Sequence, residues 1–204
     1  MEEHIISTGV DPKIPPVDLM AVGFKQAVEA IKSPESRASE IESAIRHHLT
    51  VNLDEDPEYY KSLSLRLQAI IEQTNGKWEQ QVEMLLELSN GLASERQQTA
   101  DRLGLSDTEL AFYNILMAEV TRHGDTATLD EGVHDEVKTI SQTLVGIFDE
   151  ATQIVDFFAK PDEVKRMRTA IKRAIVGSSF SDTVVPQTVQ DRFVELAQTR
   201  FGAR

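Results

Sequence analysis

Hydrophobic residues recur three and four positions apart along most of the chain, which is the spacing of one face of an α-helix. Between these stretches stand Pro, Gly, Asn and Asp, which commonly begin or end helices. The pattern predicts helices at about residues 17–32, 35–49, 57–73, 78–102, from 107 onward, 129–148, 161–176 and 186–201. We therefore expect an all-α protein, an irregular bundle of about seven or eight helices.

Several helix ends carry specific capping signals. Ser33 and Asp56 each stand directly before a proline, so each can cap a helix that begins at that proline. Ser106-Asp107-Thr108-Glu109 has the spacing of a capping box, and Gly177 is expected to end its helix in the usual glycine conformation. Residues 152–158 (TQIVDFF) are too short and too apolar for a clear helix, and we expect an extended link packed into the core.

The proline positions also suggest how the chain is divided. Residues 1–15 contain Asp11-Pro12 and Pro15, with Pro16 following, so we expect an arm or linker there. Residues 16–204 are expected to form one helical domain. If that domain has two lobes, the Thr74–Gly76 stop is the best boundary, which divides it into residues 16–75 and 76–204.

The charge is uneven along an acidic chain. The formal net charge is −13, yet residues 160–204 hold nine Lys or Arg against five Asp or Glu. The rest of the chain therefore carries −17. An acidic body repels phosphates at long range, so general nucleic-acid binding is disfavoured. A mildly basic end on an acidic body fits a docking surface better than it fits a general DNA clamp.

The predicted helix at 161–176 concentrates this basic charge on one face. Steps of 100° place Val164, Met167, Ala170, Ile171, Ala174 and Ile175 on one side and Lys165, Arg166, Arg168, Lys172 and Arg173 on the other. The apolar side must pack against other helices. The five basic residues are candidate contacts to a protein partner or to phosphates, and a merely solvated face is the third interpretation.

No catalytic, cofactor or metal site is predicted. The chain has no Cys, no P-loop and no apolar run of bilayer length. Residues 53–56 (LDED) resemble the acidic box of ATP-driven motors, but Pro57 follows at once, which favours a helix cap. Pro161-Asp162 and Glu136-Val137-Lys138 lie in the wrong order for a metal-dependent nuclease, and both are predicted helical. His134 has acidic neighbours that leave a loose metal contact open, and Trp78 is expected to anchor the core.

Four segments in order resemble the C-terminal helical region of type I restriction enzyme R subunits, covering about residues 40–201. They are residues 44–71 (AIRHHLTVNLDEDPEYYKSLSLRLQAII), 103–120 (LGLSDTELAFYNILMAEV), 144–175 (LVGIFDEATQIVDFFAKPDEVKRMRTAIKRAI) and the final helix at 185–201. R subunits are ATP-dependent DNA translocases with an endonuclease domain, and they work with a methyltransferase subunit and a specificity subunit.

This resemblance implies a fragment of an ATP-dependent type I site-specific deoxyribonuclease, with no cofactor in the fragment itself. ATP and Mg²⁺ are expected in the motor and nuclease domains of the full-length subunit, and DNA is expected to be reached through the full complex. The implied role is assembly with the methyltransferase and specificity subunits, without catalysis. A DNA- or phosphate-contacting module that uses the basic face of helix 161–176 is the alternative, and a stand-alone regulatory helical protein is a third class. The N-terminus lacks a signal-peptide layout, so we expect a cytoplasmic protein.

Overall fold

The computed structural model describes residue 19 and residues 23–123, 131–181, 184 and 186–202. This part of the chain is all-α and contains no strand, which confirms the predicted fold class. The helices are α1 (Phe24–Glu29), α2 (Pro34–Asn52), α3 (Pro57–Gln73), α4 (Trp78–Leu103), α5 (Asp107–His123), α6 (Glu131–Ala151), α7 (Pro161–Val176) and α8 (Pro186–Phe201). Two 3-10 helices, η1 (Leu53–Glu55) and η3 (Phe157–Ala159), precede α3 and α7.

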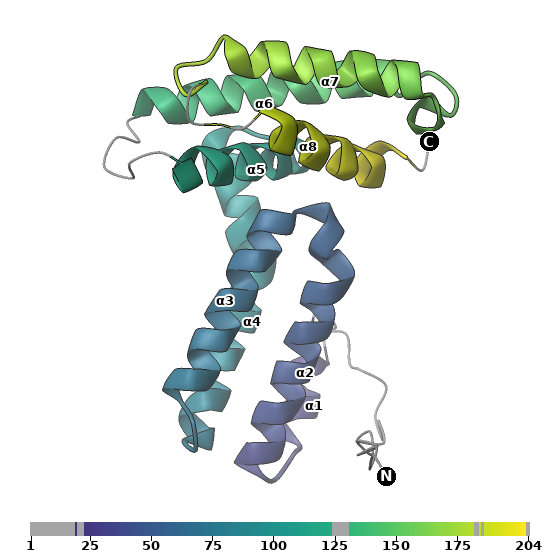
Figure 1. The fold of residues 1–204 in the computed structure, drawn as a ribbon. Helices are drawn as coiled ribbons and strands as arrows, with labels where there is room; N and C mark the ends of the chain where they lie inside the picture. Colours follow the sequence, from purple (N-terminus) through teal and green to yellow (C-terminus); the bar gives the residue numbers. More distant parts are fainter. Residues whose placement is uncertain (1–18, 20–22, 124–130, 182–183, 185, 203–204) are drawn as a thin grey trace, which may run out of the picture.

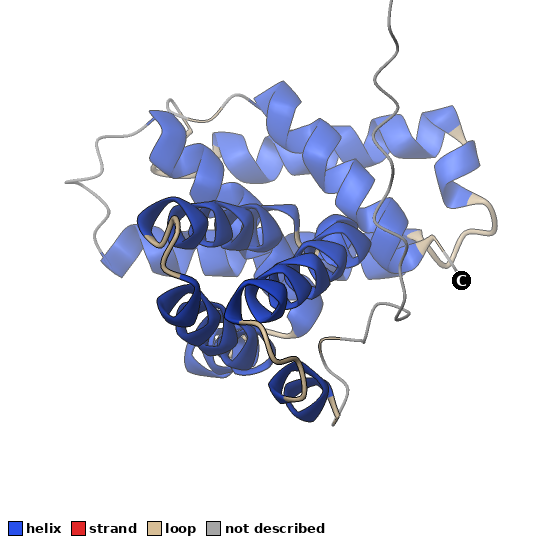
Figure 2. Cartoon of the chain, turned by 90° about the horizontal axis from the view of Figure 1, so that it is seen from below, coloured by secondary structure: helices blue, strands red, loops and turns tan. Residues whose placement is uncertain are grey.

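The helices form two parts set across one another. In Figure 1, α1 to α4 form an elongated arm, and α5 to α8 form a layer that crosses the upper end of that arm. Figure 2 looks along the arm, so its helices are seen nearly end-on in front of the others. α7 lies at the edge of the layer farthest from the free end of the arm.

Local capping chemistry explains where several helices begin. The Ser33 hydroxyl accepts a hydrogen bond from the Ser36 N–H at 3.4 Å, and the Asp56 carboxylate accepts one from the Tyr59 N–H at 3.3 Å. Ser106 and Glu109 cap each other's backbone N–H reciprocally, at 3.3 and 2.6 Å. These caps confirm the predicted starts of α2, α3 and α5.

Two hydrophobic clusters fill the interior, and α4 contributes to both. The arm cluster includes Val82, Leu85, Leu88 and Leu92 of α4, whereas Ala100 of the same helix belongs to the cluster of α5 to α8. A single continuous helix therefore runs from one cluster into the other. The division into lobes at residue 75 stays a prediction.

The cluster of α5 to α8 is built around aromatic rings. Phe112 of α5 lies 4.9 Å from the ring centroid of Phe193 on α8 and 5.6 Å from that of Phe148 on α6. All three rings are fully buried. Because the three come from different helices, their packing fixes α5, α6 and α8 relative to one another.

A buried polar network lies where the arm meets the layer, and its first centre is Asp56. This carboxylate has no exposed surface, and it accepts hydrogen bonds from Arg96 Nε of α4 at 3.1 Å and from Asn114 Nδ2 of α5 at 2.9 Å. Arg96 also pairs with Asp107 at the start of α5. Burial raises the pKa of Asp56, and the nearby Arg96 charge opposes this shift.

Two arginines of α8 complete this network. Arg192 pairs with Glu58 of α3 and, at 2.6 Å, with the buried Glu119 of α5. Arg200 donates to the Asp107 carboxylate at 2.6 Å and to the Glu55 carbonyl. The arm and the layer are therefore joined by charge-assisted hydrogen bonds to α8 as well as by the continuous helix α4.

The structure corrects four sequence-based expectations. The helix predicted at 17–32 ends earlier, because α1 ends at Glu29. Ser33 is extended, as is usual for a residue before a proline. Residues 17, 18 and 20–22 lie outside the described part. Residues 152–158 are not an extended link, because the N–H groups of residues 152–154 and 157 bond to carbonyls three or four residues earlier, in turns that lead into η3. Gly177 ends α7 in the right-handed region, with φ −82°.

Trp78 is the fourth correction, because its ring does not anchor the core. It is 39% exposed, as the first residue of α4 at the free end of the arm, and the buried stripe of that helix starts one turn later at Val82. The arm or linker that the sequence predicts at residues 1–15 is a different segment from the arm of α1 to α4, and it lies outside the described residues.

Candidate interaction surface

Helix α7 begins and packs as its sequence predicts. Pro161 is its first residue, and Asp162 and Glu163 place negative charge in the first turn, where the helix dipole favours it. Met167 and Ile171 are buried, as is the third apolar residue Ile175, and they join the cluster formed with α6 and α8. The apolar face of α7 is therefore used in packing against the layer.

The opposite face of α7 carries two parallel rows of basic side chains. Lys165 and Lys172 are seven residues apart, as are Arg166 and Arg173, and all four are exposed. Seven residues correspond to about 10 Å along an α-helix. We call these four residues the basic face of α7. Because α7 is at the outer edge of the layer, this face is open to a partner.

The structure separates the fifth basic residue, Arg168, from the other four. Arg168 pairs with Asp191 of α8, and this hydrogen bond lowers the pKa of the Asp191 carboxyl. Arg166 pairs with Glu163 within α7 at 2.7 Å, but its side chain remains largely exposed. Arg168 therefore helps to fix α7 on α8, whereas the two rows of the basic face point away from the core.

The other candidate residues from the sequence occupy structural positions. Asp56 caps α3 as predicted, and Glu136 of α6 accepts hydrogen bonds from the Ser179 backbone N–H. His134 Nδ1 lies 2.6 Å from the Tyr113 hydroxyl. Among the residues that the structure describes, no three His, Cys, Asp or Glu side chains group closely enough to hold a metal ion.

Sequence reasoning missed the residues that join the arm to the layer. Arg96, Arg192 and Arg200 had no local motif to mark them, because their partners lie between 11 and 145 residues away in the chain. Asp56 was recognised only as a cap. The only sequence signal for this network was the position of Asp56 in an acidic stretch, because several adjacent carboxylates are stabilised by cationic partners.

The geometry defines an all-α helical domain with a basic outer helix on an acidic body. The chain belongs to the family described as type I restriction enzyme HindI endonuclease subunit-like, C-terminal, whose model matches residues 6–193. This match confirms the resemblance found in the sequence. No curated protein and no solved structure matches the chain. In the described part of the chain, none of the helices combines the length and the apolar character required to cross a bilayer.

Proposed function

We propose that this chain is an assembly domain of a type I restriction R subunit. It docks the ATP-dependent translocase and endonuclease of that subunit onto the methyltransferase core, which contains the methyltransferase and specificity subunits. The observation that carries the proposal is the exposed basic face of α7 on an otherwise acidic chain. The family membership supplies the restriction context.

Electrostatics supports a protein partner with an acidic surface. The four side chains of the basic face are exposed and therefore stay hydrated until a partner binds. Exposed charges of this kind steer the approach of a partner protein and fix its orientation. Elsewhere the chain is strongly acidic and would repel the DNA backbone at long range. The basic face is therefore better suited to a protein contact of limited size than to a long DNA track.

We expect reversal of three charges on the basic face, Lys165→Glu, Lys172→Glu and Arg173→Glu together, to weaken capture of the methyltransferase and specificity subunits at least about tenfold. The matched control reverses Lys25, Lys61 and Lys77, which are exposed on other parts of the molecule. Pull-down with the purified chain measures the effect. Unchanged capture by the Lys165, Lys172 and Arg173 triple variant would show that the basic face does not bind these subunits.

Contact with DNA phosphates is the second candidate function, and the same basic face favours it. Affinity due to phosphate contacts falls with salt, with a logarithmic slope of about −0.9 for each phosphate neutralised. Binding of duplex DNA to the chain would therefore show a slope of about −3 for three contacts, and the triple reversal would abolish that dependence. A DNA affinity that the reversal leaves intact rejects this alternative.

The proposal includes no catalysis by this chain alone. We expect the purified chain to hydrolyse no ATP and to leave supercoiled DNA uncut in the presence of Mg²⁺. Phosphate release and gel electrophoresis measure the two activities. Magnesium-dependent cleavage of DNA by the purified chain would contradict this part of the proposal.

A further inference from the structure

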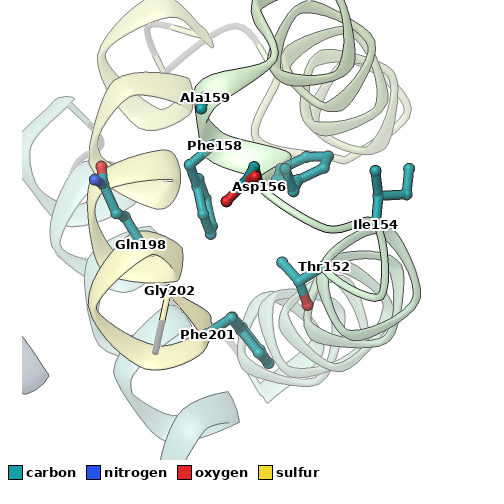
Figure 3. A pocket seen from close by; sticks show the side chains of 9 residues that line it. Thr152, Ile154, Asp156, Phe158, Ala159, Gln198, Phe201 and Gly202 are labelled. Carbon is teal, nitrogen blue, oxygen red and sulfur yellow. The ribbon is translucent and has the colours of Figure 1, made fainter. Parts of the chain in front are cut away.

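A pocket of about 330 Å³ opens where the turns after α6 meet the end of α8. Figure 3 shows that two segments of the chain line this pocket. The turns and η3 contribute Ile154 and Phe158, and α8 contributes Gln198 and Phe201. The volume falls in the range of roughly 300–1,000 Å³ that is usual for ligand-binding clefts.

Asp156 is the charged group of this pocket, and its backbone conformation is unusual. Its φ of 55° is the only positive φ of a non-glycine residue in the described part of the chain. Such a conformation is tolerated by Asp and Asn but costs energy relative to the ordinary regions. In Figure 3 the carboxylate lies beside the Phe158 ring and faces the space that Thr152 and Phe201 border.

The pocket's own polar groups do not neutralise this carboxylate. Asp156 makes no side-chain cap to η3, and it has no ion pair within the described residues. The Thr152 hydroxyl donates its proton to the Phe148 carbonyl at 2.8 Å, so it is not a donor to Asp156. The carboxylate is thus a negative charge in a pocket that Phe157, Phe158 and Phe201 also line.

Exposed apolar side chains stand at the pocket and directly beside it. Ile154 is 38% exposed and Val155 is 77% exposed, although both are large hydrophobic residues. Asp156 therefore gives the pocket a charge of opposite sign to that of the basic face of α7.

We propose that this pocket binds the basic side chain, lysine or arginine, of a protein partner. The cation pairs with Asp156, its aliphatic stem packs against Phe158 and Phe201, and the aromatic faces add cation–π attraction. Ile154 and Val155 contact apolar residues that flank the basic one. An anionic ligand is repelled by Asp156, and a purely apolar ligand leaves the carboxylate desolvated without a partner.

The test uses N-acetyl-arginine amide as the probe, with N-acetyl-norleucine amide as the neutral control. Amide chemical shifts of the full 204-residue chain are followed by NMR during titration. We expect saturable shifts concentrated at residues 152–159 and 198–202 with the arginine probe only. The Asp156→Asn variant, whose side chain tolerates the same backbone conformation, binds roughly fivefold more weakly.

The control variant Glu83→Gln makes the same change in net charge at an exposed position of α4 and is expected to bind as the wild type does. Three results would each overturn the proposal: no saturable shifts at the pocket, equal binding of arginine and norleucine probes, or unchanged binding by Asp156→Asn. None of these depends on the basic face of α7, so the pocket can fail while the proposed docking role stands.

Discussion

Replacement of Asp56 by Ala is expected to lower the free energy of unfolding by about 3–5 kcal/mol. The carboxylate has no exposed surface and accepts hydrogen bonds from Arg96, Asn114 and the Tyr59 N–H. Removal of the carboxylate leaves the Arg96 and Asn114 donors without this acceptor in a largely dry setting, and it also removes the cap of α3. The loss therefore combines a broken buried pair with a weakened helix end.

Urea denaturation followed by circular dichroism measures this loss. Asp54→Ala is the matched control, because Asp54 is exposed two residues earlier and its replacement should change the stability by less than about 0.5 kcal/mol. Asp56→Asn should lose less than Asp56→Ala: an amide oxygen still accepts a hydrogen bond, and burial already raises the pKa of the carboxyl and disfavours its charge. A loss below about 1 kcal/mol in Asp56→Ala would show that the network contributes little.

The helices were predictable because their signals are local. α3 begins at Pro57 and ends at Gln73, as the proline after Asp56 and the Thr74–Gly76 stop predict. The start of α5 follows from four consecutive residues of a capping box. Hydrophobic spacing also identified which face of α7 is buried. In each case the interacting groups lie within about one helical turn.

What the sequence could not show depends on how the helices pack. Arg168 was grouped with the basic face of α7, yet it pairs with Asp191, 23 residues later on another helix. The sequence predicts an extended link at residues 152–158, and their turns instead form a pocket with the end of α8, which Asp156 and Phe201 both line. Neither contact has a periodic signature, because both require α8 to return alongside α7.

The two proposed contact surfaces are complementary in sign. The basic face of α7 is suited to an acidic surface, and the Asp156 pocket is suited to a basic side chain. Two opposite charges at defined positions of one layer fix the orientation of a partner better than a single charged patch, because a partner docked the wrong way round meets like charge at both. Opposite charges at two positions therefore favour a specific protein interface over diffuse electrostatic binding.

Replacement of Phe112 by Ala is expected to lower the free energy of unfolding by about 3–5 kcal/mol. The Phe112 ring is fully buried between Phe148 and Phe193, so truncation leaves a cavity among helices that cannot easily collapse. Leu65→Ala is the control, because Leu65 is 66% exposed and its side chain contributes little packing. Urea denaturation followed by circular dichroism measures the total loss.

The same variant tests whether the arm and the layer unfold as one unit. Trp78 is the single tryptophan and the first residue of α4, which begins at the free end of the arm, whereas Phe112 belongs to α5 of the layer. Helix α4, the ion pairs of Arg96 with Asp107 and of Arg192 with Glu58, and the hydrogen bond from Arg200 to the Glu55 carbonyl connect the two parts. If these connections couple the clusters, the fluorescence of Trp78 and the circular dichroism lose their native values at the same, lowered urea concentration. The contrary result is a tryptophan transition that stays at its wild-type midpoint while the helical signal falls in two steps. It would show that the arm is stable without the layer. The network around Asp56 would then orient the two parts rather than hold them folded.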